Sequence, residues 1–294
     1  MKLITYKKSS NEENYRIGAL ISDGEIIDLT SLVSGENLPA AELLNCFDLE
    51  KDFLEKAGVA VSQDNLPKIA KASVHLCAPV PRPPKIICIG LNYRDHAEES
   101  GMTIPSSPII FSKFTNCARA AKQPIQLPKT SGQVDYEAEL AFVVGRRAKN
   151  VKRDAALDYV LGYTNFNDVS ARDFQFADGQ WQRGKSCDTF APMGEFIATR
   201  DEIKEPHNLQ IQFRLNGETL QDSNTSQLIF KIPELLEFLS ASITLEVGDV
   251  IATGTPPGVG FARKPPVFMK AGDVAEVEIQ GLGILSNPVE RDEE

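Results

Sequence analysis

The chain has 294 residues, of which 42% are hydrophobic and 24% charged, a composition typical of a folded globular protein. At ~150 residues per domain, this length predicts about two domains. Acidic residues outnumber basic ones by 41 to 31 and give a formal net charge of −10. This balance disfavours a broad basic face for nucleic acid or anionic lipid. It is compatible with a small anionic substrate held by a metal ion or by one local cation.

The cysteines and the apolar runs indicate the surroundings of the protein. Five cysteines are scattered along the chain without a CxxC pair, which disfavours a disulfide framework and a cysteine zinc site. The N-terminus has no apolar stretch of a secretory signal, and no apolar run approaches the ~20 residues of a membrane span. We therefore expect a reducing aqueous compartment, the cytoplasm, and no membrane partner.

Residues 1–77 predict a small α+β domain. Residues 1–7 are typical of a strand, and residues 15–32 of a hairpin around Asp23-Gly24, a strong two-residue turn signal. Residues 40–58 predict one or two helices that end near Gly58. Four prolines within residues 78–85 then form an extended stretch, where we place a domain junction. The predicted domains are therefore residues 1–77 and 78–294.

The larger domain is predicted to consist mostly of short strands. Asn216-Gly217 marks a second hairpin, and residues 153–163 are compatible with a helix. A further helix contains Ile232 to Leu239, with Pro233 at its first position. Strands without long alternating helices favour an antiparallel or mixed β architecture. The predicted strands are 85–90, 139–145, 249–255, 273–281 and 282–289.

The segment VDYEAELAFVVG holds the first pair of candidate functional residues. Glu137 and Glu139 alternate along a strand and therefore share one face. Their carboxylates are then roughly 6–7 Å apart and repel each other by about 2.5 kcal/mol at an effective dielectric of ~20. A divalent cation would turn this repulsion into attraction. The alternative interpretation is an exposed strand start with both acids in water.

Two further segments carry acids next to a base. Asp168, Arg172 and Gln175 are spaced i, i+4 and i+7, which places an acid, a guanidinium and an amide on one face of a helical turn. The simpler interpretation is an acid at a helix start paired with an exposed arginine. His96 and Glu99 are spaced i, i+3, so the carboxylate can orient the imidazole for proton transfer. The simpler interpretation here is a solvated surface histidine.

Two glycine-rich segments complete the candidate set. GQWQRGKS, residues 179–186, matches the phosphate-loop pattern, but it lacks the preceding buried strand and the following helix that such a loop requires. Lys185 remains of interest as a cation close in sequence to Asp168. In GTPPGVG, residues 254–260, backbone amides and the Thr255 hydroxyl could contact an anion. A tight turn without a ligand is the alternative.

Five segments, in this order, resemble the fumarylacetoacetate hydrolase family. They are IGLNYRDHAEE, DYEAEL, NDVSARDFQ, GKSCDTFAP and GTPPGVG, and with the strands between them they cover roughly residues 85–290. The resemblance implies an α+β, mostly β fold: a mixed β-roll with a small N-terminal α+β domain, assembled as a homodimer. It also implies an enzyme. The chain has no confident equivalent of a fourth carboxylate ligand that some members carry, and it therefore resembles the shorter, three-carboxylate branch.

The resemblance also assigns roles to residues. Glu137, Glu139 and Asp168 are implied to bind Mg²⁺ or Mn²⁺, and hard carboxylate ligands independently favour these ions. His96 and Glu99 are implied to activate water, and Lys185 to be the catalytic cation. The implied substrate contacts are Arg172, Gln175, Gly254 and Thr255.

These assignments predict a hydrolase that cleaves a carbon–carbon bond in a small anionic 2,4-dioxo acid. Candidate substrates are acylpyruvates, fumarylpyruvate and diketo-deoxy sugar acids, and the products are a pyruvate-type 2-oxo acid and a carboxylic acid. Two alternatives use the same metal site: oxaloacetate decarboxylation, and isomerisation of a 2-hydroxy-dienedioate with proton transfer through His96. A non-catalytic, metal-stabilised binding protein is a distant alternative, since a fold does not fix a function.

Overall fold

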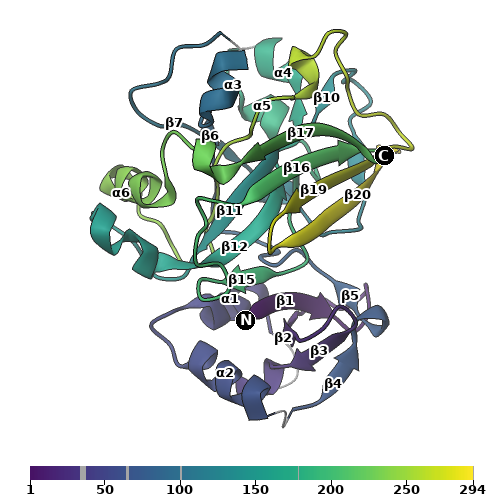
Figure 1. Cartoon of the computed structure of the whole chain (residues 1–294). Helices are drawn as coiled ribbons and strands as arrows, with labels where there is room; N and C mark the ends of the chain where they lie inside the picture. Colours follow the sequence, from purple (N-terminus) through teal and green to yellow (C-terminus); the bar gives the residue numbers. More distant parts are fainter. Residues whose placement is uncertain (34–37, 64–65, 100, 178, 294) are drawn as a thin grey trace.

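Figure 1 shows the computed structural model, which describes residues 1–33, 38–63, 66–99, 101–177 and 179–293. Its largest element is an eleven-stranded sheet that joins the N-terminal part of the chain to the larger part. Strand β5 (His75–Leu76) pairs with β1 beside the main path of this sheet. The order along the path is β4 (Lys68–Ala70), β3 (Glu25–Asp28), β2 (Arg16–Leu20), β1 (Lys2–Lys7), β15 (Ile197–Thr199), β12 (Val160–Asn167), β11 (Ala138–Val144), β18 (Val250–Ala252), β6 (Ile86–Gly90) and β7 (Ile109–Lys113).

The N-terminal part contains the predicted hairpin and helices. Strands β2 and β3 pair antiparallel on either side of Asp23-Gly24, which confirms the hairpin. Helix α2 (Phe53–Gln63) runs past Gly58, where the sequence predicted an end. It follows α1 (Ala40–Leu43) and a 3₁₀ turn at Leu44–Phe47. Since β1 also pairs with β15, with Leu3 opposite Ile197, one sheet crosses the predicted junction. The division into 1–77 and 78–294 stays a prediction.

A second, five-stranded sheet packs beside the central strands of the first (Figure 1). The ring of Tyr136, just before β11, stacks on Phe213 of the second sheet with ring centroids 4.0 Å apart. The second predicted hairpin is confirmed, since Asn216 and Gly217 adopt positive φ angles of 53° and 83° between antiparallel strands. The strand order of this sheet is β17 (Glu218–Asn224), β16 (Gln210–Leu215), β19 (Val274–Ile279), β20 (Gly283–Arg291) and β9 (Ile125–Leu127).

Strand β11 is the centre of the fold. All seven of its residues are buried, and it pairs antiparallel with β12 and with β18. Its sequence, AELAFVV, is apolar enough to be buried on both faces, apart from Glu139. A charged side chain at this depth costs free energy unless it has partners. The sequence therefore places an ionisable group in a fully buried strand that is paired on both sides.

Short helical segments cover the remaining surfaces. Helix α6 (Ile232–Ser242) has Pro233 in its first turn, as predicted. Residues 153–163 differ from the prediction: a 3₁₀ helix at Arg153–Tyr159 leads directly into β12, whose residues are all buried. None of the helices in the described part of the chain is long and apolar enough to cross a bilayer. The other helices are α3 (Arg94–Glu99), α4 (Arg172–Ala177) and α5 (Gln182–Lys185).

Parallel and antiparallel strand pairs occur together in this fold. Strands β18 and β6 are parallel, as are β20 and β9, whereas most other pairs are antiparallel. Two short pairs add to this pattern. These are the antiparallel β10 (Val134–Asp135) with β13 (Ser170–Ala171) and the parallel β14 (Ala191–Pro192) with β8 (Ala118–Arg119). The predicted α+β, mostly β fold with mixed sheets is thus confirmed.

Candidate metal and proton-transfer site

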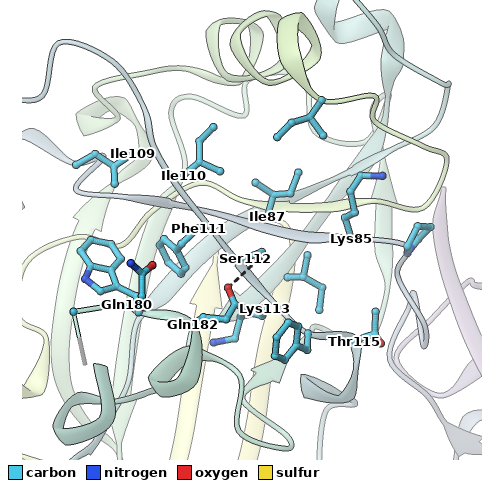
Figure 2. A pocket seen from close by; sticks show the side chains of 16 residues that line it. Lys85, Ile87, Ile109, Ile110, Phe111, Ser112, Lys113, Thr115, Gln180 and Gln182 are labelled. Atoms are coloured by element: carbon cyan, nitrogen blue, oxygen red, sulfur yellow. Dashed lines mark hydrogen bonds between the residues drawn. The ribbon is translucent and has the colours of Figure 1, made fainter. Parts of the chain in front are cut away.

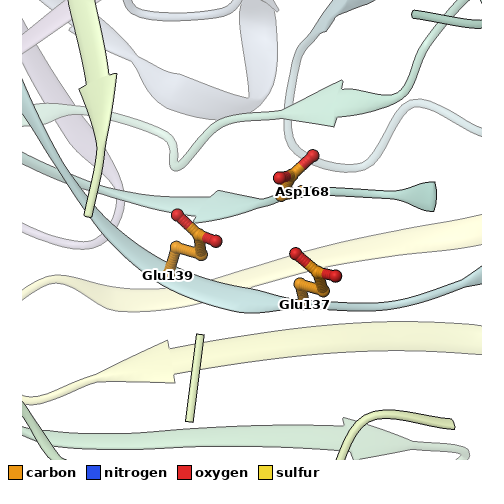
Figure 3. A group of neighbouring side chains, drawn as sticks. All are labelled: Glu137, Glu139 and Asp168. Atoms are coloured by element: carbon orange, nitrogen blue, oxygen red, sulfur yellow. The ribbon is translucent and has the colours of Figure 1, made fainter. Parts of the chain in front are cut away.

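Three carboxylates meet where β11 begins and β12 ends (Figure 3). Glu137 immediately precedes β11, Glu139 lies within it, and Asp168 follows β12. The antiparallel register places Ala138 opposite Asn167 and so brings the three side chains to one place. One oxygen from each lies within 4.8 Å of the others, and all three residues are buried. The structure therefore brings the three predicted ligands together, away from bulk water.

Each carboxylate of this triad is held on one oxygen by a donor from outside it. Arg172 Nη2 lies 2.7 Å from Glu137 Oε1, and Lys113 Nζ lies 2.5 Å from Asp168 Oδ1. The third donor is the backbone N–H of Gly254, 2.8 Å from Glu139 Oε2. Three independent elements thus fix the orientations of the three acids.

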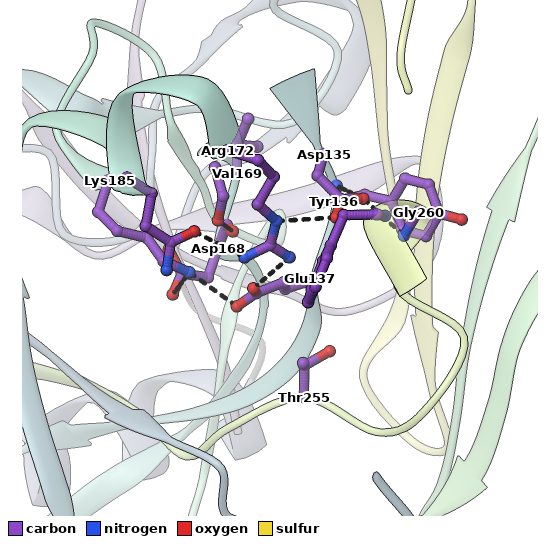
Figure 4. Close-up of polar contacts among 12 residues, drawn as sticks. Asp135, Tyr136, Glu137, Asp168, Val169, Arg172, Lys185, Thr255 and Gly260 are labelled. Carbon is purple, nitrogen blue, oxygen red and sulfur yellow. Dashed lines mark hydrogen bonds and ion pairs between the residues drawn. The ribbon is translucent and has the colours of Figure 1, made fainter. Parts of the chain in front are cut away.

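Lys185 contacts the second carboxylate oxygen of two acids of the triad, Glu137 and Asp168 (Figure 4). Its Nζ lies 2.8 Å from Glu137 Oε2 and 2.9 Å from Asp168 Oδ2. Burial alone would lower the pKa of this amine, but the two carboxylates outweigh burial and raise it. Lys185 is therefore a buried, charged amine in direct contact with two of the three predicted ligands.

The charges of the triad are unevenly compensated. Burial would raise the pKa of Glu137, but Lys185 and Arg172 lower it to about 2. Burial raises the pKa of Glu139 well above its usual range, and repulsion from Asp168 and Glu137 raises it further. Within the described residues Glu139 makes no ion pair, and the Gly254 N–H is its hydrogen-bond donor. The cluster therefore lacks positive charge at Glu139.

This donor set fits a divalent cation. Three carboxylates are the hard oxygen ligands that Mg²⁺ and Mn²⁺ prefer. Each of the three donors engages one oxygen of a carboxylate, Lys185 contacts the second oxygen of Glu137 and of Asp168, and Glu139 lacks the countercharge that an ion would supply. Glu137, Glu139 and Asp168 would hold the ion, as the sequence predicted.

Two charged residues of this cluster were not predicted. Asp135 accepts a hydrogen bond from Arg172 Nε at 2.9 Å and also binds the N–H groups of Gly260 and Phe261. Its spacing gives a signal, because Asp135 lies two residues before Glu137 on the same alternating face. Lys113 gives no comparable signal, since its partner Asp168 is 55 residues away in sequence.

The predicted proton-transfer pair lies on α3. His96 Nδ1 is buried, lacks a hydrogen bond among the described residues, and is 3.4 Å from Glu99 Oε2. Glu99 Oε2 also accepts a hydrogen bond from the N–H of Gly258 at 3.1 Å. Helix α3 and the glycine-rich turn are thus in contact through the carboxylate that faces the imidazole.

The turn at 254–260 connects this pair to the triad. Gly254 has a φ of +102°, and a Cβ atom there would lie 2.8 Å from the Cβ of Asn92, so a glycine is required. Asn92 fixes the start of α3 by donating to the Thr253 and Phe230 carbonyls. The Thr255 hydroxyl donates to the Ala138 carbonyl at 3.0 Å. The turn therefore packs against β11 and also borders α3.

Arg172 and Gln175 are both buried, whereas the simpler interpretation of the sequence expected an exposed arginine. Arg172 pairs with Asp135 and Glu137 and donates to Gln175 Oε1 at 2.9 Å. Asp168 does not share their helix, because α4 begins only at Arg172. The substrate contacts assigned to Arg172, Gln175, Gly254 and Thr255 stay predictions.

The phosphate-loop match lies in a different structural context from a phosphate loop. The segment before it is helix α4, where a phosphate loop requires a buried strand. Its lysine, Lys185, points to two carboxylates. These contacts support the sequence-based decision against nucleotide binding.

Two cavities lie near the cluster. A cavity of about 770 Å³ lies beside the edge strand β7 and is lined mostly by apolar side chains, Trp181 among them. Ile87 and Ile110, which also line it, are labelled in Figure 2. Lys113 also lines it, although its amine contacts Asp168. A second cavity, of about 560 Å³, borders Glu99 and Arg263. Of these two cavities, the second is the one that has a residue of the proton-transfer pair, Glu99, in its lining.

Comparison with known proteins identifies the family. The model described as "Fumarylacetoacetate (FAA) hydrolase C-terminal" matches residues 85–290, which is most of the chain and includes every predicted site residue. The chain belongs to the fumarylacetoacetate hydrolase family. This confirms the resemblance, and relatives named as enzymes confirm the expectation of an enzyme at this level.

One similar relative is "Oxaloacetate tautomerase fahd2, mitochondrial" of Xenopus laevis, 45% identical over 98% of this chain and 90% of the relative. Among solved structures, a fumarylacetoacetate hydrolase from Exiguobacterium antarcticum is 34% identical with a TM-score of 0.85, covering 99% of this chain and all of that one. A maleylpyruvate hydrolase from Sphingobium sp. SYK-6, in complex with manganese(II) and pyruvate, is 31% identical with a TM-score of 0.82 over the full length of both chains.

The expectation of a cytoplasmic protein is wrong in the light of these relatives, several of which are named mitochondrial. The expectation rested on five unpaired cysteines and on the lack of a secretory or membrane-spanning stretch. Those features indicate reducing, aqueous surroundings. They do not distinguish one such compartment from another, so the composition carried less information than the prediction assumed.

Proposed function

We propose that this protein is a metal-dependent enzyme that interconverts the enol and keto forms of a small 2-oxo dicarboxylic acid, with oxaloacetate as the first substrate to test. The observation that carries the proposal is a buried carboxylate triad with uncompensated negative charge, connected through one turn to a histidine–glutamate pair. A relative that is 45% identical and carries the name oxaloacetate tautomerase supports this substrate class.

The chain's own residues can perform the proton transfer. A divalent ion, Mg²⁺ or Mn²⁺, would supply a Lewis acid for the 2-oxo group and its adjacent carboxylate. Glu99 lies beside His96 Nδ1, so Nε2 is the nitrogen available to the substrate. In the enol-to-keto direction, a proton leaves the 2-hydroxyl oxygen and another is added at carbon 3, with no net redox change. Lys185 stabilises the negative charge that develops on the oxygen.

Hydrolysis of a carbon–carbon bond in a 2,4-dioxo acid is the second candidate function. It is favoured by the likeness to the Sphingobium maleylpyruvate hydrolase, whose structure contains manganese(II) and pyruvate. The same residues would serve differently: His96 would remove a proton from water, and Lys185 would stabilise the leaving enolate. Decarboxylation of oxaloacetate would need Lys185 but no attacking water.

Product analysis separates these reactions. The full-length protein, stripped with chelator and reloaded with Mn²⁺, is given enol-oxaloacetate and, separately, an acylpyruvate. Tautomerisation predicts faster loss of the enol's ultraviolet absorbance, with neither pyruvate nor CO₂ formed at a comparable rate. Pyruvate and CO₂ from oxaloacetate would support the decarboxylase, and pyruvate plus a carboxylic acid from the acylpyruvate would support the hydrolase. An unchanged enol lifetime with the Mn²⁺-loaded protein contradicts the tautomerase proposal.

The assembly is part of the same proposal. We expect the homodimer that the family resemblance implied, and light scattering of the purified protein measures its mass directly. A monomer at micromolar concentration would contradict this expectation and would leave the proposed chemistry unaffected.

A further inference from the structure

Lys113 is a buried cation whose function the proposed reaction does not yet explain. It ends the edge strand β7, and its side chain is 0% exposed. Nζ lies 2.5 Å from Asp168 Oδ1 and 2.9 Å from the carbonyl oxygen of Val169. Both acceptors lie in the short connection between β12 and β13. Lys113 therefore holds one oxygen of a predicted ligand together with the backbone beside it.

Lys113 and Lys185 contact different oxygens of the same carboxylate. Lys185 lies at Asp168 Oδ2 and also at Glu137 Oε2, and it thus bridges two of the three predicted ligands. Lys113 lies at Oδ1, as one of the three outer donors. An ion held by the triad would thus meet Lys185 directly, whereas Lys113 can remain in place behind Asp168.

The charges show what Lys113 contributes. Among the residues that the structure describes, four buried carboxylates surround three buried cations, so the cluster lacks one positive charge when all four acids are ionised, as metal ligands are. Without Lys113 it would lack two. Charges a few ångströms apart at low dielectric interact strongly, so one fixed cation opposes the entry of a divalent ion and attracts an anion once that ion is bound. The four acids are Asp135, Glu137, Glu139 and Asp168, and the cations are Lys113, Arg172 and Lys185.

We propose that Lys113 is a positioning residue and a fixed countercharge that weakens the affinity of the triad for a divalent ion and strengthens the affinity of the ion-loaded site for an anionic 2-oxo acid. The inference rests on the proposed metal-dependent function and assigns Lys113 a part in its substrate selection. It differs from a packing role, because loss of packing would disturb both kinds of binding in the same direction.

The test measures two affinities on the full-length protein. Calorimetry gives the dissociation constant of Mn²⁺ for the chelator-stripped protein, and then that of oxalate, as a 2-oxo acid mimic, for the Mn²⁺-saturated protein. The variants are Lys113→Met, which removes the charge, Lys113→Gln, which keeps a hydrogen-bond donor, and Lys113→Arg, which keeps the charge. Lys270→Met, at an exposed position, is the matched control.

We expect opposite shifts in the two uncharged variants. Mn²⁺ should bind about threefold tighter or more, and oxalate about threefold weaker or more. Lys113→Arg should restore both affinities toward those of the wild type, and Lys270→Met should change neither. If Lys113→Met does not fold, Lys113→Gln supplies the comparison. In that variant the Mn²⁺-induced rise in thermal midpoint should exceed the rise in the wild type.

Any result other than opposite shifts overturns the inference. Weaker binding of both Mn²⁺ and oxalate would mean that Lys113 only maintains the local structure. Unchanged affinities would mean that the charge of Lys113 does not influence the binding of Mn²⁺ or oxalate. A wild-type protein that binds no Mn²⁺ would overturn this inference and the metal-dependent function together, whereas wild-type binding without opposite shifts in the variants overturns the Lys113 inference alone.

Discussion

The carboxylate triad and the histidine–glutamate pair are built in different ways. The triad is buried, and each of its acids is held by a donor from a different element. The pair lies on a six-residue helix; Glu99 is 39% exposed, and its carboxylate is 3.4 Å from His96. The sheet thus fixes the triad, whereas the pair depends on a short helix and on one hydrogen bond to a turn.

This difference suits the two tasks. Metal ligands must converge before an ion arrives, and their mutual repulsion has to be offset by fixed donors. A proton-transfer group has to approach a substrate that enters and leaves, and contacts of this kind tighten only when the substrate is bound. The predictions below alter one region at a time.

Glu139→Gln should break the triad and leave the pair intact. Because Glu139 lies beside two other carboxylates, its neutralisation should remove Mn²⁺ binding and lower activity by more than about 1,000-fold. The metal-free variant should be at least as thermally stable as the wild type, since burial and the neighbouring acids disfavour the charged form of Glu139 and a neutral amide avoids this cost. Calorimetry and thermal unfolding measure the two effects. Undiminished Mn²⁺ binding would show that the ligands are elsewhere.

His96→Asn should disable the histidine–glutamate pair and leave the triad intact. We expect a fall in kcat of about 100-fold or more, because a positioned proton-transfer group contributes at least this much, with Mn²⁺ affinity unchanged. His75→Asn is the control, since His75 lies on β5 in the N-terminal part and contacts Gln123. A variant of His96 that retains full tautomerase activity would exclude this residue from the proton transfer.

Much of the site could be predicted because its residues lie in short, patterned segments. The alternation of Glu137 and Glu139 on a strand needed only the two-residue period, and the His96–Glu99 spacing needed only one helical turn. The family resemblance assigned Asp168 to the triad, and the structure brings it there, although the helix predicted to contain it begins only at Arg172. Asp168 directly follows β12, and it reaches the triad because β12 pairs with β11 in a register that cannot be read from the sequence.

The features that could not be predicted depend on pairing between segments that are distant in the sequence. Lys113 reaches Asp168 only because β7 is the sheet edge next to β6, and no local pattern marks that contact. The same holds for β1 and β15, which join the two predicted domains into one sheet. The segment 153–163 has a helical composition, yet its last four residues belong to the buried strand β12 beside β11, so tertiary pairing overrides local propensity there.

Gly254→Ala tests the backbone donor of the triad. Its Cβ would lie 2.8 Å from the Cβ of Asn92, at a φ of +102°. Gly272→Ala is the matched control, because its φ is +94° but no atom lies within 4 Å of the added Cβ. We expect Gly272→Ala to lose about 1–2 kcal/mol from backbone strain, and Gly254→Ala about 2 kcal/mol more. Denaturant unfolding of the metal-free proteins measures both, and equal losses would contradict a close-contact role for Gly254.

The smallest expected effect concerns a histidine outside both regions, and it affects how a pH profile of activity is interpreted. Burial, assisted by Lys231, lowers the pKa of His207 to about 4 from 6.5, and its Nε2 accepts the Ile232 N–H at the start of α6. The folded state therefore binds this proton less readily than the unfolded state does. The stability contributed by the neutral imidazole is complete above pH 6.5 and is lost as the pH falls toward 4.

After allowance for partial exposure, the wild type should lose about 1 kcal/mol more than His207→Gln between pH 7 and pH 5. Urea unfolding at the two pH values measures this difference, and groups that titrate equally in both proteins cancel. Equal losses would mean that His207 keeps an ordinary pKa. If the difference is found, pH profiles of activity should be recorded in His207→Gln as well, so that loss of folded protein is separated from loss of catalysis.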